Sequence, residues 1–297
     1  MFVAVAFNSN IAATSPDGIT WTQWPLPATA RWADIAWNGS IFCAITNNSN
    51  IAATSPDGAV WAQHALPSTR LWSEIAWNGS VFCAVTRDSG SSTISATSPD
   101  GITWTSHSTL PPTLGWDGLA WNGAVFCAVA INDVIAATSP DGAVWTQQTL
   151  PITSGWMDIA WNGSTFCAIS GGTRVVTSPD GVTWTERAMP VSESWAAIAF
   201  GNGVFCAVAA FSNIAATSPD GIAWTLHTLP ADTSWWDIAW DGDAFCTISR
   251  NSNIAATSPD GITWTQRILP TSALWETVAG RPEFTPFWKN YRRCVET

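Results

Sequence analysis

Short apolar runs separated by polar turns recur along most of the chain. Residues 32–72 show the pattern once. Four runs rich in β-branched, aromatic and small apolar side chains lie at residues 32–37, 41–46, 51–54 and 60–63. Runs of this length bounded by Gly, Pro and Asn predict β-strands. The unit is therefore expected to contain four short antiparallel strands.

Two turn motifs separate the runs. Asn38-Gly39 predicts a two-residue hairpin turn because both positions tolerate positive φ. In Ser55-Pro-Asp-Gly58, Pro fixes φ, Asp can accept backbone N–H groups, and Gly takes the left-handed conformation. We expect both turns on one face of the molecule and the remaining loops on the opposite face.

The turn Ser-Pro-Asp-Gly occurs seven times at intervals of about 40 residues, with its aspartates at Asp17, Asp57, Asp100, Asp141, Asp180, Asp220 and Asp260. Four antiparallel strands per repeat of this length predict the blade of a β-propeller. Residues 2–5 align with the second strand, and residues 275–279 align with the first. The predicted fold is thus all-β, a seven-bladed β-propeller over residues 1–280. Its N- and C-terminal strands share one blade and close the ring.

Composition narrows the class of protein. Hydrophobic residues make up 46% of the chain, and the net charge is −11. The acidic balance argues against nucleic acid and anionic membranes as partners. No apolar run approaches the ~18 residues of a membrane span, and the N-terminus lacks a basic start. We expect a soluble chain without signal peptide or membrane insertion, for which both the cytoplasm and a virion remain open.

Residues that recur in every repeat are interpreted as packing residues. Six cysteines follow Phe at one repeat position, which indicates small buried hydrophobes. Two Trp positions also recur in each unit, as contacts between blades require. His64, His107 and His227 share an outer-strand position, where neighbouring blades are too far apart for a common metal. We therefore predict no metal, no cofactor and no catalytic residue.

Carboxylates cluster on the predicted inner strands. Four share one repeat position and two stand one residue earlier: Asp34, Glu74, Asp158 and Asp237, then Asp117 and Glu276. A ring of negative charge at the central channel could hold a cation or a cationic group. Alternatively, each carboxylate accepts backbone N–H groups and fixes its own blade. We favour the second interpretation because no unit adds a second ligand.

Length variation among the repeats indicates a binding face. The spacing from the repeated Cys to the turn Asp is 14 residues in most units, but 17 from Cys83 to Asp100 and 13 from Cys167 to Asp180. That segment holds the second-to-third strand loop, and binding residues tend to lie on variable loops. Trp24 and Trp236 break the Trp pattern and are further candidates. The predicted ligand-binding residues are Phe7, Trp24, Asn47, Asn48, Arg87, Asp88, Asn132, Asp133, Arg174, Phe211, Trp236, Arg250 and Asn251. Ordinary turn chemistry is the alternative for each of them.

The motif Ser-Pro-Asp-Gly-Ile-Thr-Trp at residues 15–21 resembles a shortened Asp-box of sialidase-type (BNR) propellers, which has one more residue between Asp and Gly. Residues 200–224 are similar to repeats of bacterial surface proteins, phage tail proteins and photosystem II assembly-factor propellers. The resemblance covers residues 1–280 and implies the propeller fold. Sialidase activity does not carry over, because that family uses a Tyr nucleophile and the only Tyr here is Tyr291, outside the predicted propeller.

We predict a non-catalytic recognition or display propeller that binds a glycan or a protein through its variable loop face, as part of a phage tail, virion or surface assembly. The alternatives are a sialidase-like glycoside hydrolase and an assembly-factor scaffold. Carboxylates paired about 5–10 Å apart in one pocket would favour the hydrolase. The basic, aromatic tail at residues 281–297 is either a strap over the disc or an attachment segment for a larger assembly.

Overall fold

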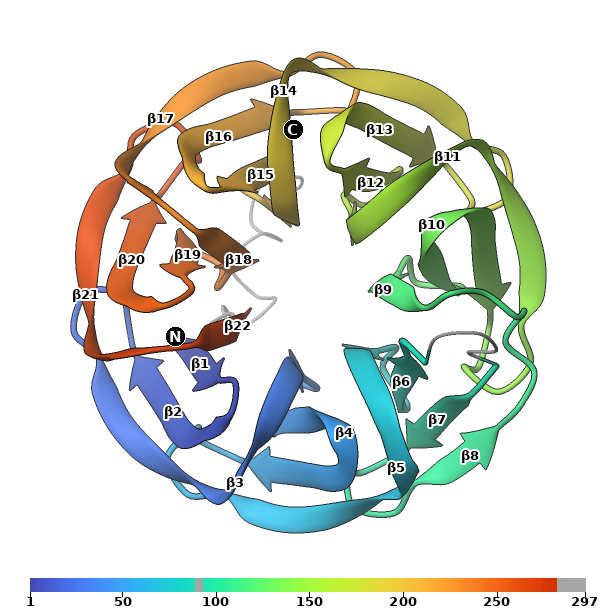
Figure 1. The fold of residues 1–297 in the computed structure, drawn as a ribbon, viewed down its shortest axis with the longest axis horizontal. Helices are drawn as coiled ribbons and strands as arrows, with labels where there is room; N and C mark the ends of the chain where they lie inside the picture. Colours follow the sequence, from blue (N-terminus) through green and yellow to red (C-terminus); the bar gives the residue numbers. More distant parts are fainter. Residues whose placement is uncertain (89–92, 282–297) are drawn as a thin grey trace, which may run out of the picture.

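The structure, a computed structural model, describes residues 1–88 and 93–281. Its regular elements within these ranges are all β-strands, and every pairing between them is antiparallel. Figure 1 shows the strands arranged around a central axis, with the two ends of the ring meeting at β1 and β22. The tail beyond residue 281, including Tyr291, lies outside the described residues.

The strands form three sheets, with the orders β22-β1-β2-β3-β4-β5-β6-β7-β8, β17-β16-β15-β14-β13-β12-β11-β10-β9 and β18-β19-β20-β21. Their bounds are β1 Phe2–Ala6, β2 Ser9–Ser15, β3 Thr22–Trp37, β4 Phe42–Ser55, β5 Ala62–Trp77, β6 Phe82–Thr86, β7 Ser95–Ser98, β8 Thr105–His107, β9 Trp116–Trp121, β10 Phe126–Ser139, β11 Thr146–Trp161, β12 Phe166–Ser170, β13 Gly172–Ser178, β14 Thr185–Gly201, β15 Val204–Ala210, β16 Ser212–Ser218, β17 Thr225–Thr233, β18 Trp235–Trp240, β19 Phe245–Ser249, β20 Ser252–Ser258, β21 Thr265–Ala273 and β22 Trp275–Gly280.

Several strands are longer than the sequence predicts. β5 joins the expected outer strand of one repeat to the inner strand of the next, across Leu66-Pro67, where we expected a connector between two strands. The φ that proline fixes is compatible with extended backbone, so the connector can remain in strand conformation. β3, β11 and β14 do the same, whereas β17 and β18 stay separate elements.

The two ends of the chain pair as the internal alignment predicts. β1 lies antiparallel to β22, with Val3 opposite Ala279. The N-terminal ammonium of Met1 contacts Asp241 Oδ2 at 2.7 Å, and Arg281 N–H donates to the carbonyl of Met1 at 2.7 Å. Ladder hydrogen bonds therefore hold β1 against β22, and an ion pair ties the start of β1 to the turn after β18.

The repeated apolar residues form the contacts between repeats. The six cysteines from Cys43 to Cys246 are buried and free, which confirms the packing interpretation for the described cysteines. Gly101 of one Ser-Pro-Asp-Gly turn packs directly on the preceding repeat, because a Cβ there would lie 3.0 Å from Cys43 Sγ. The turn therefore also serves as a close contact between neighbouring repeats, which explains why Gly occupies this position in every turn.

The turn aspartates stabilise their own turns. Asp57 Oδ1 accepts N–H groups from Ala59 and Val60 at 2.9 and 3.1 Å, and the Trp61 indole donates to the carbonyl of Gly58. The backbone hydrogen bond from Ala59, more than any other contact, lowers the pKa of Asp57 below its usual value. The predicted structural role of these aspartates is confirmed.

The Asn-Gly turns differ in part from our prediction. Among the Asn residues of these turns, only Asn202 has positive φ together with its Gly, as a two-residue turn with positive φ at both positions requires. In the turn after β3, Asn38 Oδ1 instead accepts the N–H groups of Ser40 and Ile41, and Asn38 N–H donates to the carbonyl of Ile41. The asparagine side chain thus stabilises a four-residue loop there.

The described residues contain no helix long and apolar enough to cross a membrane.

Candidate functional site

The inner strands carry β-bulges that direct two successive side chains toward the central axis. In β3 the register shifts between Trp32 and Asp34, so that Ala33 has no partner of its own on β4. The same shift occurs between Trp72 and Glu74 in β5. An extra residue re-aims the neighbouring side chains and breaks the simple alternation of a strand. The bulge residue and the residue after it therefore both face the axis.

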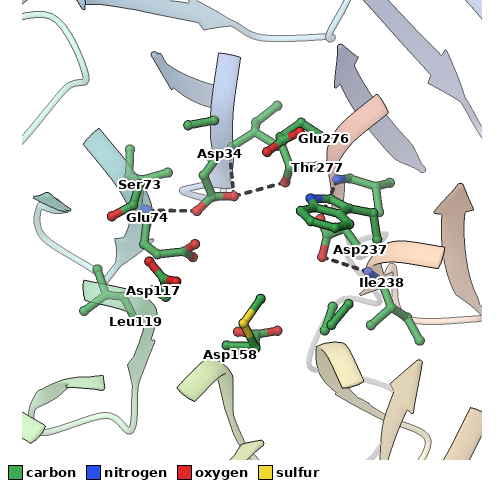
Figure 2. A pocket seen from close by; sticks show the side chains of 18 of the residues that line it. Asp34, Ser73, Glu74, Asp117, Leu119, Asp158, Asp237, Ile238, Glu276 and Thr277 are labelled. Carbon is green, nitrogen blue, oxygen red and sulfur yellow. Dashed lines mark hydrogen bonds between the residues drawn. The ribbon is translucent and has the colours of Figure 1, made fainter. Parts of the chain in front are cut away.

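These side chains line a cavity of about 300 Å³, the central pocket (Figure 2). Its charged residues are Asp34, Glu74, Asp117, Asp158, Asp237 and Glu276, together with Arg87. Phe7, Asn47 and Arg87 belong to the ends and loops of second strands, and they place the pocket on the loop face. The carboxylates that we singled out on the inner strands thus lie in one site.

Three of the aspartates connect successive repeats through their carboxylate oxygens. Asp34 Oδ1 accepts the N–H of Ile35, and Asp34 Oδ2 accepts the N–H of Ile75 on the next inner strand, at 2.7 and 2.8 Å. In the same way, Asp158 accepts the N–H groups of Ile159 and Ile198. Asp237 accepts the N–H groups of Ile238 and Val278. The prediction that carboxylates accept backbone N–H groups is confirmed for these three. The prediction that each fixes only its own blade is incomplete, since each bridges two.

Glu74 occupies the same repeat position but makes no such bridge. Among the described residues it accepts no hydrogen bond and forms no ion pair. The crossing from its repeat to the next is made instead by Ser73, whose hydroxyl donates to the carbonyl of Trp116 at 2.6 Å. The Glu74 side chain is one methylene longer than that of Asp34. Glu74 is consequently a pocket carboxylate that bonds to no described residue.

Two arginines among the described residues, Arg87 and Arg250, place their guanidinium groups at the rim of the pocket. Arg87 Nε lies 3.0 Å from Asp117 Oδ1, and Arg250 lies 3.0 Å from Glu276 Oε2. The Arg250 guanidinium also stacks 4.2 Å from the ring centre of Trp236 and 5.5 Å from that of Phe7. The pocket therefore already holds cationic groups through carboxylates and aromatic faces.

Confinement of several carboxylates in one cavity makes their ionisation difficult. Burial raises the pKa of Asp34 to about 7 and that of Glu276 to about 7, the latter against the opposing charge of Arg250. Burial also raises the pKa of Asp117 to about 6, against the charge of Arg87. For Glu74, burial and then the charges of Asp34 and Asp158 raise the pKa well above its usual value. An added cation would offset this accumulated negative charge.

Part of the predicted binding set converges on the pocket. Phe7, Asn47, Arg87 and Trp236 line it, and Arg250 contacts two of them. These residues come from loops that are distant in sequence and from the bulge of β18.

The other predicted residues of the loop face lie at the loop turns. Each has either a left-handed backbone conformation or a hydrogen-bond partner within the fold. Asn48, Asn132, Phe211 and Asn251 occupy the left-handed region, with φ between 55° and 62°. Asp88 accepts the N–H of Leu71 and Asp133 that of Val134, while Arg174 donates to the carbonyl of Thr153. Phe211 is the apolar member of the four left-handed residues, and its side chain is 74% exposed.

Trp24 lies elsewhere, on the outer part of β3, where its indole donates to Thr14 Oγ1 at 2.9 Å. His64, His107 and His227 contact the equivalent threonines Thr54, Thr97 and Thr217. Trp24 is thus one of several side chains that serve the same outer-strand hydrogen bond.

The predicted binding set omitted the carboxylates that dominate the pocket. Their common repeat position was the available signal, and it did identify them as an inner-strand cluster. Within the described residues, no group of three or more His, Cys, Asp or Glu side chains is arranged to hold a metal ion. The cluster therefore differs from a compact metal site.

No protein-family model matches the chain, and no curated protein matches it in sequence. Solved structures do match. A virginiamycin B lyase from Staphylococcus aureus has a TM-score of 0.72 at 10% identity, over 80% of this chain and 84% of the lyase chain. YCF48 from Cyanidioschyzon merolae has a TM-score of 0.63 at 17% identity, over 83% of this chain and 87% of YCF48. A chain of a nidogen/laminin complex has a TM-score of 0.59 at 10% identity, over 78% of this chain and 95% of the other. At such identities the likeness shows the fold alone: this chain is a β-propeller.

Proposed function

We propose that the chain is a seven-bladed β-propeller that acts as a non-catalytic recognition module, with a protein partner bound on its loop face. The carrying observation is the convergence of Phe7, Asn47, Arg87 and Trp236 on the central pocket, because the sequence predicts the first three from loop variability and Trp236 from its break in the Trp pattern. A concave site with a few converging polar groups is the usual form of a binding site.

The number of blades is supported by the repeat itself. Seven Ser-Pro-Asp-Gly turns divide the chain into units of similar length, and each unit contributes one inner-strand Trp that is fully buried. The pairing of β1 with β22 supplies the inner strand that the N-terminal unit lacks.

A protein partner suits the pocket better than a glycan. Sugar rings stack on exposed aromatic faces, whereas the Trp236 face is covered by the Arg250 guanidinium at 4.2 Å. The loop-face carboxylates favour a partner with basic groups. Propellers similar to this one include a chain from a nidogen/laminin complex, a protein assembly. A role in a phage tail, virion or surface assembly is part of the same proposal, and the tail that would attach it lies outside the described residues.

Glycoside hydrolysis fits less well, although six carboxylates share one pocket. That chemistry needs two carboxyl groups that act on the substrate. Asp34, Asp158 and Asp237 already accept backbone N–H groups with both oxygens. Asp117 and Glu276 are paired with arginines. Only Glu74 remains for an acid or base, which leaves the second role unfilled.

The proposal is tested by applying the labelled protein to a peptide array and a glycan array. Asn47→Ala and Phe211→Asn alter the loop face, and Val60→Asn alters an exposed side chain beside a turn of the opposite face. Peptide hits that disappear with the loop-face variants and persist with Val60→Asn would support it. Hits lost only with Val60→Asn would contradict the assignment of binding to the loop face. Hits confined to glycans would show that the partner is a glycan and not a protein.

A further inference from the structure

We propose that Glu74 and Asp117 bind a primary ammonium group in the central pocket, an inference that rests on the loop face being the binding face. The two residues lie on adjacent inner strands, β5 and β9. Figure 2 shows their carboxylates on the same side of the pocket. The ligand class is an ammonium carried on a flexible chain, either a lysine side chain of a partner or a free amine.

The first support is that Glu74 lacks the bridge to the next inner strand that Asp34, Asp158 and Asp237 form. Where Asp34, Asp158 and Asp237 stand, the carboxylate accepts an N–H of the next inner strand. Glu74 has no such bond with a described residue, although Leu119 stands on β9 where Ile75, Ile198 and Val278 stand on their own strands. The same strand adds a second carboxylate, Asp117, beside Glu74.

The second support is a buried oxygen without a partner. Asp117 is 5% exposed, and within the described residues Oδ2 accepts no hydrogen bond. Arg87 reaches only Oδ1, at 3.0 Å. A buried carboxylate oxygen left without a donor is unfavourable, and a ligand N–H would remove this cost.

The third support is that the chain's own cations occupy the neighbouring positions. Arg250 is held by Glu276, Trp236 and Phe7, and Arg87 is held by Asp117. These contacts show that carboxylates of this pocket can retain a cationic group at its rim. Glu74 and Asp117 Oδ2 are the acceptors that the two guanidinium groups leave unused.

The shape of the ligand follows from the acceptors. An ammonium is a compact charge with three donors, which suits oxygens from two strands. A guanidinium is planar and larger, and two already fill the rim. A bare divalent ion needs more oxygen ligands than a pair of carboxylates offers, in agreement with the absence of a metal-type cluster among the described residues.

The test is isothermal titration of the full chain with two probes, cadaverine and the peptide acetyl-Gly-Gly-Lys-Gly-Gly-amide. The peptide with an acetylated lysine side chain serves as the neutral comparison. We expect one-to-one binding of an ammonium probe and none of the neutral peptide. Tighter binding of the lysine peptide would assign the site to a protein side chain, and tighter binding of cadaverine to a free amine; either result sustains the ammonium site.

Two variants locate the site. Glu74→Gln keeps the side-chain size and is expected to weaken binding by about tenfold or more. Asp243→Asn removes the same charge from an exposed turn of the opposite face and should change affinity by less than about twofold. The proposal fails if neither ammonium probe binds up to about 10 mM, or if both variants weaken binding equally. Array binding that survives such a failure, and remains sensitive to Phe211→Asn, would leave the proposed function standing.

Discussion

The Ile75 N–H donates to Asp34 Oδ2 at 2.8 Å, although the two residues lie on inner strands of successive repeats. Asp34 Oδ1 also accepts the hydroxyl of Thr277 on β22, at 3.0 Å. One carboxylate therefore links three inner strands, whereas Glu74, the next residue at this repeat position, makes no such link to a described residue. This contrast separates the structural carboxylates of the pocket from the one available to a ligand.

Asp34→Ala should destabilise the protein. The substitution leaves the amides of Ile35 and Ile75 and the hydroxyl of Thr277 without their acceptor, and an unsatisfied buried donor costs about 1–3 kcal/mol. We expect a loss of about 2 kcal/mol or more in the free energy of unfolding, measured by denaturant titration. Asp34→Asn keeps one acceptor oxygen and should lose less. Equal stability of both variants and the wild type would show that the bridge contributes nothing.

Glu74→Gln should have the opposite effect on stability. Because burial raises the pKa of Glu74 well above its usual value, ionisation of this group is less favourable in the folded than in the unfolded protein. Removing the charge should raise the melting temperature near pH 8 and leave it almost unchanged near pH 4. Thermal melts of both proteins across this range test the point. A variant that melts lower than the wild type near pH 8 would mean that Glu74 has a structural partner.

The wild-type protein should lose stability as the pH rises from about 4 to about 7. Burial raises the pKa of Asp34 to about 7, that of Asp237 to about 6 and that of Glu276 to about 7. Between the unfolded and folded pKa values the unfolded chain binds fewer protons, so its free energy falls relative to the folded state. The groups that face one another across the pocket are Asp34, Glu74, Asp117, Asp158, Asp237, Glu276, Arg87 and Arg250.

An ammonium ligand should oppose this loss. Cadaverine is expected to raise the melting temperature near pH 8, where the pocket carboxylates ionise, and to have little effect near pH 4. Equal stabilisation at both pH values, or the same stabilisation in Glu74→Gln, would argue that cadaverine acts outside the pocket.

Phe211→Asn should preserve or increase stability. Phe211 has φ of 60°, a conformation that costs a non-glycine residue about 1 kcal/mol and that Asn tolerates better. The equivalent loops carry Asn48 and Asn251 with φ of 58° and 62°. We expect a gain of up to about 1 kcal/mol in denaturant titration together with weaker partner binding. A clear loss of stability would show that the exposed ring packs on the fold.

Gly142→Ala should be much more damaging than Gly123→Ala. Both residues have positive φ, but a Cβ at Gly142 would lie 2.8 Å from Cys83 Sγ, whereas a Cβ at Gly123 would meet nothing within 4 Å. Strain at φ is common to both variants, and the clash adds about 1–3 kcal/mol at Gly142. Similar melting temperatures for the two variants would contradict the close contact between turn and neighbouring repeat.

The repeat pattern was sufficient to predict where strands occur, though not how far β3, β5, β11 and β14 extend. It also predicted the turn role of Asp57 and the pairing of β1 with β22, because these depend on local sequence and internal alignment. The composition of the pocket was harder to predict from the sequence. A strand read by strict alternation places Trp236 and Asp237 on opposite faces, yet the bulge of β18 brings both to the central pocket. Bulges and contacts between repeats depend on tertiary packing, which the pattern of one repeat does not encode.

The roles of individual side chains were even harder to predict from the sequence. Trp24 stands out as an irregular Trp in the sequence, but its indole makes the same hydrogen bond to a threonine that His64 makes in the next repeat. Glu74 looks equivalent to Asp34, and only the structure reveals that its carboxylate accepts no hydrogen bond from the described residues, whereas Asp34 accepts two backbone N–H groups. Equivalence by position therefore predicts location better than it predicts role.

A crystal structure of the wild-type protein soaked with cadaverine would show whether Glu74 and Asp117 bind an ammonium group. We expect density for one ammonium group within hydrogen-bond distance of Glu74 and of Asp117 Oδ2, in the central pocket of the loop face. An empty pocket at saturating cadaverine, or density only beside the Ser-Pro-Asp-Gly turns of the opposite face, would contradict it.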